Sequence, residues 1–287
     1  METKAPYVIT EDIRTISRFG DYHVRDIVAR YISQSVLLHC TKFVSDSAIM
    51  LYEKDLTEWI TKVSPEDSVV KTIAYSENLQ SPFSLKITRV FDEQFDKITT
   101  HQAPRQGYAP LDVQLVNFGL FRGHTLIDDI ILNGRDCKDI VEMSKLKNVV
   151  FDKIIACVAT NKGKKVFNSY GVKVESLYYF DSVIDIICER DFIPGLPFSG
   201  RTVIIEDGEY RYAPRLLPWG NPTEWASVPI ENASSFSKVC ISTAIEFWEE
   251  VYPSVRFFEV PAVIYDPKIT STKLRFVDYL HHCYKAL

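Results

Sequence analysis

The sequence predicts an α/β protein with a doubly wound, mainly parallel sheet flanked by helices. Strands and helices alternate in the middle of the chain, where β-branched apolar runs are separated by segments with helical spacing. Crossovers of this length join parallel neighbouring strands. The composition, 46% hydrophobic and 25% charged over 287 residues, is that of an ordinary folded chain with a large core.

We expect three parts. Residues 1–66 would form a mostly helical extension, residues 67–200 the α/β core, and residues 201–287 an α+β extension packed on the core. In the first part, apolar spacing predicts a helix over 22–38 and another through 56–59, with a strand or a helix near residue 50.

The core is expected to open with a strand over 68–75, followed by a polar turn and a helix-compatible stretch to about residue 95. Residues 99–110 hold two prolines and a glycine and predict a loop. The rest of the core alternates: a strand over 123–129, a helix over 137–145, a strand over 149–158, a short helix within 161–171 and a strand over 172–180. The last part predicts a helix over 234–250 and a strand over 256–260.

The net charge, the cysteines and the absence of long apolar runs limit the binding partners and the cellular location that we expect. Lys and Arg number 33 against 38 Asp and Glu, a net charge of -5, which argues against a nucleic-acid surface built from the whole molecule. Six separated cysteines with no CxxC pair predict reduced thiols. Residues 1–11 lack the apolar core of a secretory signal, and no run approaches the ~18 apolar residues of a membrane span. We therefore expect a cytoplasmic protein that does not bind membranes.

Two acids and a glycine mark the segment that carries chemistry. Asp128 and Asp129 close a predicted strand, and Gly134 lies in the turn before the next helix. Ligands of an open parallel sheet bind beyond the carboxyl ends of the strands, where a helix start offers N–H groups and its positive dipole end to an anion. Acids there take ribose hydroxyls, directly or through Mg²⁺. The pattern predicts a ribose-phosphate site, and its structural alternative is a strand ending in solvated acids before a capped helix.

This segment resembles the signature of the type I phosphoribosyltransferase family, which is an apolar strand, two acids, three mostly apolar residues and Thr-Gly-x-Thr entering a helix. Here the acids are Asp128 and Asp129, and the turn is Asn133, Gly134, Arg135 and Asp136. The resemblance covers about residues 67–200 and is specific at 123–136. It implies that the two acids are catalytic and hold the ribose hydroxyls together with Mg²⁺, and that the turn binds the 5′-phosphate of phosphoribosyl pyrophosphate.

The same resemblance implies roles for further positions. They are a pyrophosphate loop at Ser76, Glu77 and Asn78, base-binding residues Lys162, Asp191 and Phe192, and a mobile loop carrying His101 and Arg105. Phe192 also fits a core position, and Lys162 a solvated helix face.

The implied function is that of a glycosyltransferase of nucleotide metabolism, which binds phosphoribosyl pyrophosphate or a nucleotide with Mg²⁺ and transfers or removes a purine-like base at ribose C1. Two departures motivate an alternative: Asn133 and Asp136 replace the family's threonines, and Ser76–Asn78 lacks glycine. The alternative is a catalytically degenerate regulator, or an effector or toxin subunit of a bacterial anti-phage, retron-like defence system. The family resemblance also implies a homodimer, and the terminal extensions would carry a protein or nucleic-acid partner.

Overall fold

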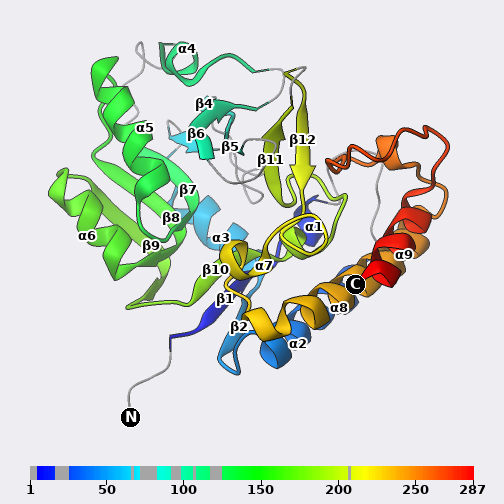
Figure 1. Ribbon diagram of the computed structural model, residues 1–287. Helices are drawn as coiled ribbons and strands as arrows, with labels where there is room; N and C mark the ends of the chain where they lie inside the picture. Colours follow the sequence, from blue (N-terminus) through cyan, green and yellow to red (C-terminus); the bar gives the residue numbers. More distant parts are fainter. Residues whose placement is uncertain are drawn as a thin grey trace. The chain divides into compact units, whose positions relative to one another are not determined.

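A computed structural model describes residues 5–16, 26–65, 68–71, 83–91, 98–105, 108–116, 125–205 and 208–287 (Figure 1). The chain forms two compact units. Unit 1 lies within Met1–Leu51, Phe91–Lys97 and Ile184–Leu287, and unit 2 within Tyr52–Val90 and Ile98–Val183. Each contains a parallel sheet flanked by helices, so the predicted α/β class is confirmed.

Unit 2 is built on a sheet of five parallel strands in the order β4-β3-β7-β8-β9. These strands are β3 (Val69–Lys71), β4 (Phe83–Leu85), β7 (Thr125–Ile131), β8 (Lys153–Thr160) and β9 (Lys173–Phe180). Numbered along the chain within this sheet, the order is 2-1-3-4-5, so the strand order reverses between β3 and β7. Ligands of such sheets bind beyond the carboxyl ends of the strands at this switch point.

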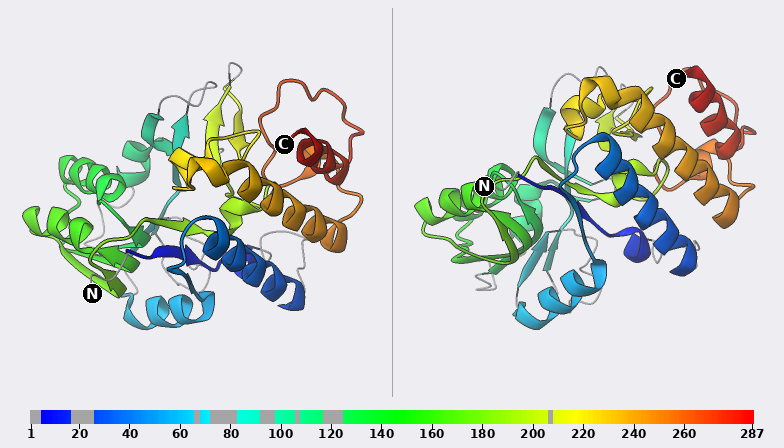
Figure 2. Two further views of the ribbon diagram at one scale, coloured as in Figure 1. Left: turned by 60° about the horizontal axis from the view of Figure 1, so that its bottom comes forward. Right: turned by 90° about the horizontal axis from the view of Figure 1, so that it is seen from below.

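Helices cover both faces of this sheet (Figure 2). On one face lie α5 (Arg135–Leu146) and α6 (Asn161–Ser169), whose apolar side chains share a core with Leu126, Ile154 and Ala156. On the other face α3 (Glu53–Val63) packs against β8. A strand covered on both sides should be apolar throughout, and β8 is buried from Ile154 to Thr160. The unit also contains the short helix α4 (Leu111–Val116).

The segment from residue 83 to residue 105 differs from the prediction. Where a helix-compatible stretch is expected, the chain forms β4 and then β5 (Ile87–Phe91). The first half of the expected loop over 99–110 belongs to the strand β6 (Ile98–Pro104). β-branched and aromatic residues favour strands in both segments. Pro104 is the last residue of β6, so this proline marks the end of a strand and not a loop.

Unit 1 is built on a three-stranded parallel sheet in the order β10-β1-β2. The strands are β1 (Tyr7–Thr10), β2 (Ala48–Leu51) and β10 (Asp185–Cys188). The strand β1 lies inside the extension expected to be mostly helical, and the segment near residue 50 is a strand. Because β1 pairs with β10, the start of the chain shares a sheet with residues beyond 184. The division between units therefore falls near residues 51 and 183, and not at 66 and 200.

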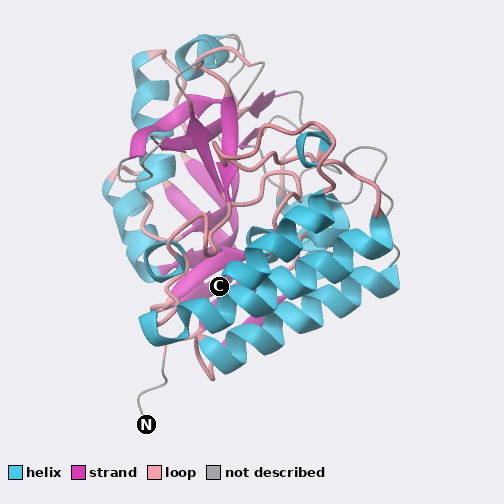
Figure 3. Cartoon of the chain, turned by 45° about the vertical axis from the view of Figure 1, so that its right-hand side comes forward, coloured by secondary structure: helices cyan, strands magenta, loops and turns pink. Residues whose placement is uncertain are grey.

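Long helices pack beside this sheet and form the core of unit 1 (Figure 3). They are α2 (Asp26–Phe43), α8 (Ala233–Val251) and α9 (Phe276–Ala286), with the short α1 (Ile13–Ile16) and α7 (Pro222–Trp225). The helix α8 packs against both α2 and α9. Its fully buried Trp248 donates its indole N–H to the Pro194 carbonyl at 2.8 Å. The helix predicted over 234–250 is confirmed.

The remaining elements of unit 1 are short. They are the antiparallel pair β11 (Arg201–Ile204) and β12 (Tyr210–Ala213) and the 3-10 turns η2 (Glu189–Phe192), η3 (Ile230–Asn232) and η4 (Phe257–Glu259). The predicted strand over 256–260 is wrong, because only Arg256 forms a bridge, to Arg275, and the next residues turn into η4. All six cysteines are buried free thiols. Within the described ranges, no helix is long and apolar enough to cross a membrane.

Candidate functional site

The two acids of the motif lie inside β7 and not at its end, since the strand continues to Ile131. Asp128 is fully buried. Its Oδ1 accepts the N–H of Asp129 at 2.9 Å, and its Oδ2 accepts the Cys137 thiol of α5 at 2.8 Å. The Asp128 carboxylate is therefore turned toward α5.

Asp129 belongs to the opposite face of the sheet, because successive strand residues alternate. Asp128 pairs with Ala156 in register, which places Asp129 beside Cys157 of β8. Burial first, then the charges of Asp129 and Asp128, raise the pKa of the Cys157 thiol well above its usual value. Asp129 is only half-buried. The structure thus places the two predicted acids on different faces of the sheet.

The turn between β7 and α5 consists of Leu132, Asn133 and Gly134. Gly134 has a φ of +74° and is the residue before α5. A Cβ added there would lie 2.9 Å from the Phe167 ring and 3.3 Å from Val166 of α6, so the turn needs glycine for both its conformation and its space. Asn133 is exposed. Arg135 and Asp136 form the first turn of α5, and their side chains lie outside the described part of the structure.

The junction between β8 and α6 fixes the position of the turn from Leu132 to Gly134. The Thr160 hydroxyl donates to the Leu132 carbonyl and accepts the Gly163 N–H, the latter at 3.1 Å. A Cβ at Gly163 would lie 2.9 Å from the Ile131 carbonyl oxygen, so the start of α6 approaches the end of β7 closely. Two helix N-termini therefore meet at the carboxyl edge of the sheet. Lys162 is exposed in the first turn of α6.

This edge has the chemistry of an anion site. The first N–H groups of a helix have no partner within the helix. The residue before α5, Gly134, has no side chain that could accept a hydrogen bond from them. Such N–H groups, with the positive end of the helix dipole, favour a phosphate. Asn133 and Asp129 add polar groups that can meet hydroxyls of the same ligand.

The predicted residues elsewhere in unit 2 stand as follows. Ser76, Glu77 and Asn78 lie outside the described residues. His101 belongs to β6, and its side chain is also outside them. Arg105 follows β6 directly and donates its backbone N–H to the Lys86 carbonyl at 2.9 Å. The loop predicted to carry His101 and Arg105 over the site is thus a strand in its first half, up to Pro104.

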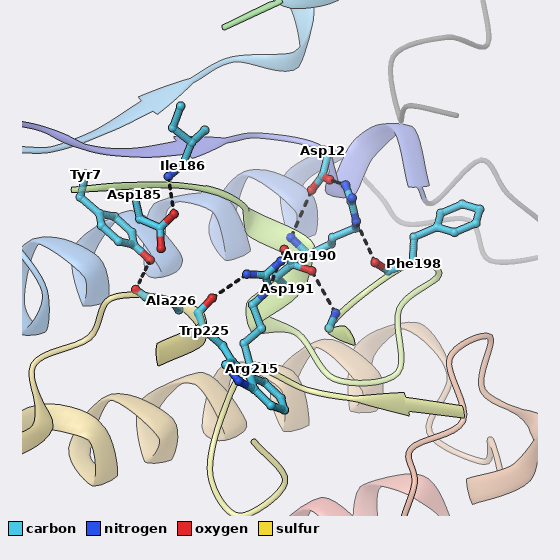
Figure 4. Close-up of polar contacts among 11 residues, drawn as sticks. Tyr7, Asp12, Asp185, Ile186, Arg190, Asp191, Phe198, Arg215, Trp225 and Ala226 are labelled. Carbon is cyan, nitrogen blue, oxygen red and sulfur yellow. Dashed lines mark hydrogen bonds and ion pairs between the residues drawn. The ribbon is translucent and has the colours of Figure 1, made fainter. Parts of the chain in front are cut away.

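Asp191 and Phe192 lie in unit 1, and Figure 4 shows the polar contacts of Asp191. Phe192 is fully buried in the hydrophobic core and packs edge-to-face on Phe236, with ring centroids 5.2 Å apart. The Asp191 carboxylate accepts the Gly200 N–H at 2.9 Å and pairs with Arg215 Nε at 3.2 Å. Packing thus holds Phe192 in the core and ion pairing holds Asp191, and the base-binding role of both stays a prediction.

Sequence reasoning missed a buried cluster of ionisable side chains at the carboxyl ends of β1 and β10. Asp12, fully buried, accepts the backbone N–H of Arg190 at 3.1 Å and is ion-paired with its guanidinium. The Nε of Arg190 donates to the Phe198 carbonyl at 3.2 Å. Glu189, also fully buried, accepts the N–H groups of Asp12 and Ile13 at 3.1 and 2.9 Å. The available signal was two charged runs, Glu11-Asp12 and Glu189-Arg190-Asp191, each directly after an apolar segment.

Comparisons with known proteins found similarity only among solved structures. No family model and no curated protein matches the chain. An orotate phosphoribosyltransferase from Aeropyrum pernix is 12% identical, with 44% of this chain and 68% of that chain covered at a TM-score of 0.27. A UMP synthase from Leishmania donovani is 12% identical, with 57% and 33% covered at a TM-score of 0.28, so this chain spans about a third of that protein. What the chain binds therefore has to be inferred from the sheet order and the turn after β7.

Proposed function

We propose that unit 2 binds phosphoribosyl pyrophosphate or a nucleotide, and that it transfers or removes a purine-like base at ribose C1. The observation that carries the proposal is the Gly134 turn. It has a positive φ, is closed against Phe167, and opens α5 at the carboxyl end of the strand beside the switch point of a 2-1-3-4-5 sheet. A phosphate at this turn would meet the N–H groups at the start of α5.

The remaining groups suit the rest of such a ligand. Asp129, half-buried in β7, would accept the ribose hydroxyls. Among the described residues no cluster of three or more His, Cys, Asp or Glu side chains is arranged to hold a metal ion. Mg²⁺ needs only one or two carboxylates when substrate phosphates supply further oxygens, so Asp129 together with the ligand fits this ion. Bound Mg²⁺ would neutralise charge on the departing pyrophosphate.

A second function is favoured by one observation. The Asp128 carboxylate is buried and engaged by Cys137 and by the Asp129 N–H, which leaves Asp129 as the acid on the other face of β7. A site that presents only one acid of the pair fits a protein that binds the ligand without turning it over. That protein would be a regulator or an effector acting through a partner.

Titration calorimetry with phosphoribosyl pyrophosphate and Mg²⁺ tests the site. The variant Asn133→Asp adds a negative charge at an exposed position of the turn, and Asn148→Asp adds the same charge at the other end of α5, also exposed and with a φ of 60°. A unit charge roughly 6 Å from a phosphate at an effective dielectric constant of about 40 costs about 1.4 kcal/mol, or about tenfold in affinity.

The proposal expects saturable binding by the wild-type protein, about tenfold weaker binding by Asn133→Asp, and no change in Asn148→Asp. The charge at position 133 should at the same time stabilise α5, because acids are favourable at helix N-termini. A loss of affinity without a loss of stability is therefore specific to an anion site. Absence of binding by folded wild-type protein, or equal affinities in both variants, would contradict the proposal. Pyrophosphate release with a panel of bases then separates the transferase from the binding protein.

A further inference from the structure

We propose that Cys137 is a positioning residue of this site, whose thiol holds the Asp128 carboxylate against α5 and thereby fixes the turn from Leu132 to Gly134. Its consequence for a ligand rests on the proposed function. The effect on the turn does not.

The contact joins the two elements on either side of the turn. Asp128 lies in β7, four residues before Leu132, and Cys137 is the third residue of α5. The Cys137 thiol donates to Asp128 Oδ2 at 2.8 Å, and both side chains are buried, at 2% and 0% exposure. The chain between them cannot move away from the sheet without separating this pair.

Because this pair is buried, the hydrogen bond between Cys137 and Asp128 contributes to stability beyond packing. A carboxylate withdrawn from water is stable only where donors face its oxygens, and hydrogen bonds to charged groups are stronger than neutral ones. Asp128 Oδ1 accepts the Asp129 N–H, and Oδ2 accepts the Cys137 thiol. The start of α5 adds the positive end of its dipole. Removing the thiol donor therefore weakens the hold of α5 on the strand.

A second anchor acts on the turn from the other side. The Thr160 hydroxyl donates to the Leu132 carbonyl, at the beginning of the turn, while Cys137 acts just beyond its end. With both ends tied, the N–H groups at the start of α5 keep one orientation before any ligand arrives. Such preorganisation raises affinity by removing the cost of ordering the turn on binding.

The test compares Cys137→Ala with Cys137→Ser, which differ by one hydroxyl donor. Ile140→Val serves as a packing control, because Ile140 is fully buried one turn further along α5 and takes no part in the polar contacts. Two readouts are taken on the full chain. The first is amide hydrogen exchange across residues 132–138, and the second is the affinity for phosphoribosyl pyrophosphate with Mg²⁺.

We expect Cys137→Ala to speed exchange in the turn by about tenfold or more, and to weaken binding by about tenfold, the loss typical of a hydrogen bond to a charged group. Cys137→Ser should stay within about threefold of the wild type in both readouts. Ile140→Val should change neither at the turn, even where it lowers the melting temperature.

The outcomes separate this inference from the proposed function. Equal turn exchange in Cys137→Ala and Cys137→Ser overturns the positioning role, whatever the protein binds. Faster exchange with unchanged affinity in a binding wild type overturns its importance for the ligand. A wild type that does not bind refutes the proposed function, and the exchange measurement still decides whether Cys137 fixes the turn.

Discussion

Glu189 makes the stability of unit 1 depend on pH near neutrality. It opens η2 and is fully buried, with Oε1 accepting the N–H groups of Asp12 and Ile13. Burial, as the largest cause, raises the pKa of this carboxyl from 4.5 to about 8. The charge of Glu11 also raises this pKa, while the Ile13 N–H, the Ser33 hydroxyl and Arg14 lower it. The folded protein therefore holds a proton on Glu189 at pH 7.

The direction and size of the effect follow from proton linkage. Between pH 4.5 and about 8 the folded state binds one more proton at Glu189 than the unfolded state does. The free energy of unfolding then falls by about 1.4 kcal/mol for each unit of rising pH. This contribution is complete below the unfolded pKa and is lost through the folded one, so roughly 2 kcal/mol disappears between about pH 6 and pH 8.

The variant Glu189→Gln should remove that fall. Its amide oxygen can still accept the two backbone N–H groups, and it does not ionise. Urea unfolding between pH 6 and pH 8, followed by tryptophan fluorescence, reports on unit 1, which contains Trp219, Trp225 and Trp248 of the four tryptophans. We expect the wild type to lose roughly 2 kcal/mol more than Glu189→Gln over this range. The exposed Glu231→Gln is the control and should follow the wild type. Parallel pH profiles for wild type and Glu189→Gln would refute the reasoning.

Two further predictions concern the turns of unit 2. Gly134→Ala and Gly171→Ala both place a Cβ at a φ of +74°, but only position 134 has a neighbour within 4 Å, so the pair separates backbone strain from collision. Gly171→Ala should lose about 1 kcal/mol of unfolding free energy and Gly134→Ala about 1–3 kcal/mol more, measured by urea unfolding followed by circular dichroism, and equal losses would mean that Phe167 gives way freely. Thr160→Val removes the hydroxyl shared by Leu132 and Gly163 and should cost about 2 kcal/mol, whereas Thr160→Ser, which keeps the hydroxyl and loses the methyl group, should stay close to the wild type in the same measurement. A loss in Thr160→Ser as large as in Thr160→Val would contradict the special role of the hydroxyl.

Local signals in the sequence predicted the alternation of strands and helices in unit 2 after residue 125. The apolar residues Val166 and Phe167 indicate the helix over 161–169. Gly171 indicates its end, and it takes the positive φ expected after a helix. The helix α5 begins directly after Gly134, as the turn residue indicates. These features depend on residues a few positions apart, which is the range over which pattern reasoning works.

Unit 1 could not be predicted in this way because its sheet joins distant segments. The strand β1 has four residues, and its neighbours are β2, about forty residues later, and β10, near residue 185. A strand this short has no periodicity of its own and is stable only through those partners. The same distance hid the Asp12–Arg190 ion pair, whose members are 178 positions apart in the chain.

Asp128 and Asp129 show why a sequence motif alone does not assign functional roles to its residues. A sequence pattern places Asp128 and Asp129 side by side, and the expectation that both meet one ribose requires the strand to end at or before them. In the structure the strand continues to Ile131, so the pleat sends the two carboxylates to opposite faces. One is then drawn to Cys137, a residue outside the family pattern, and the other stays half-buried beside Cys157. The pleat of β7 and the Cys137 thiol together therefore decide how many acids the proposed site can offer. Exchanging Cys137 tests this arrangement more directly than exchanging either aspartate.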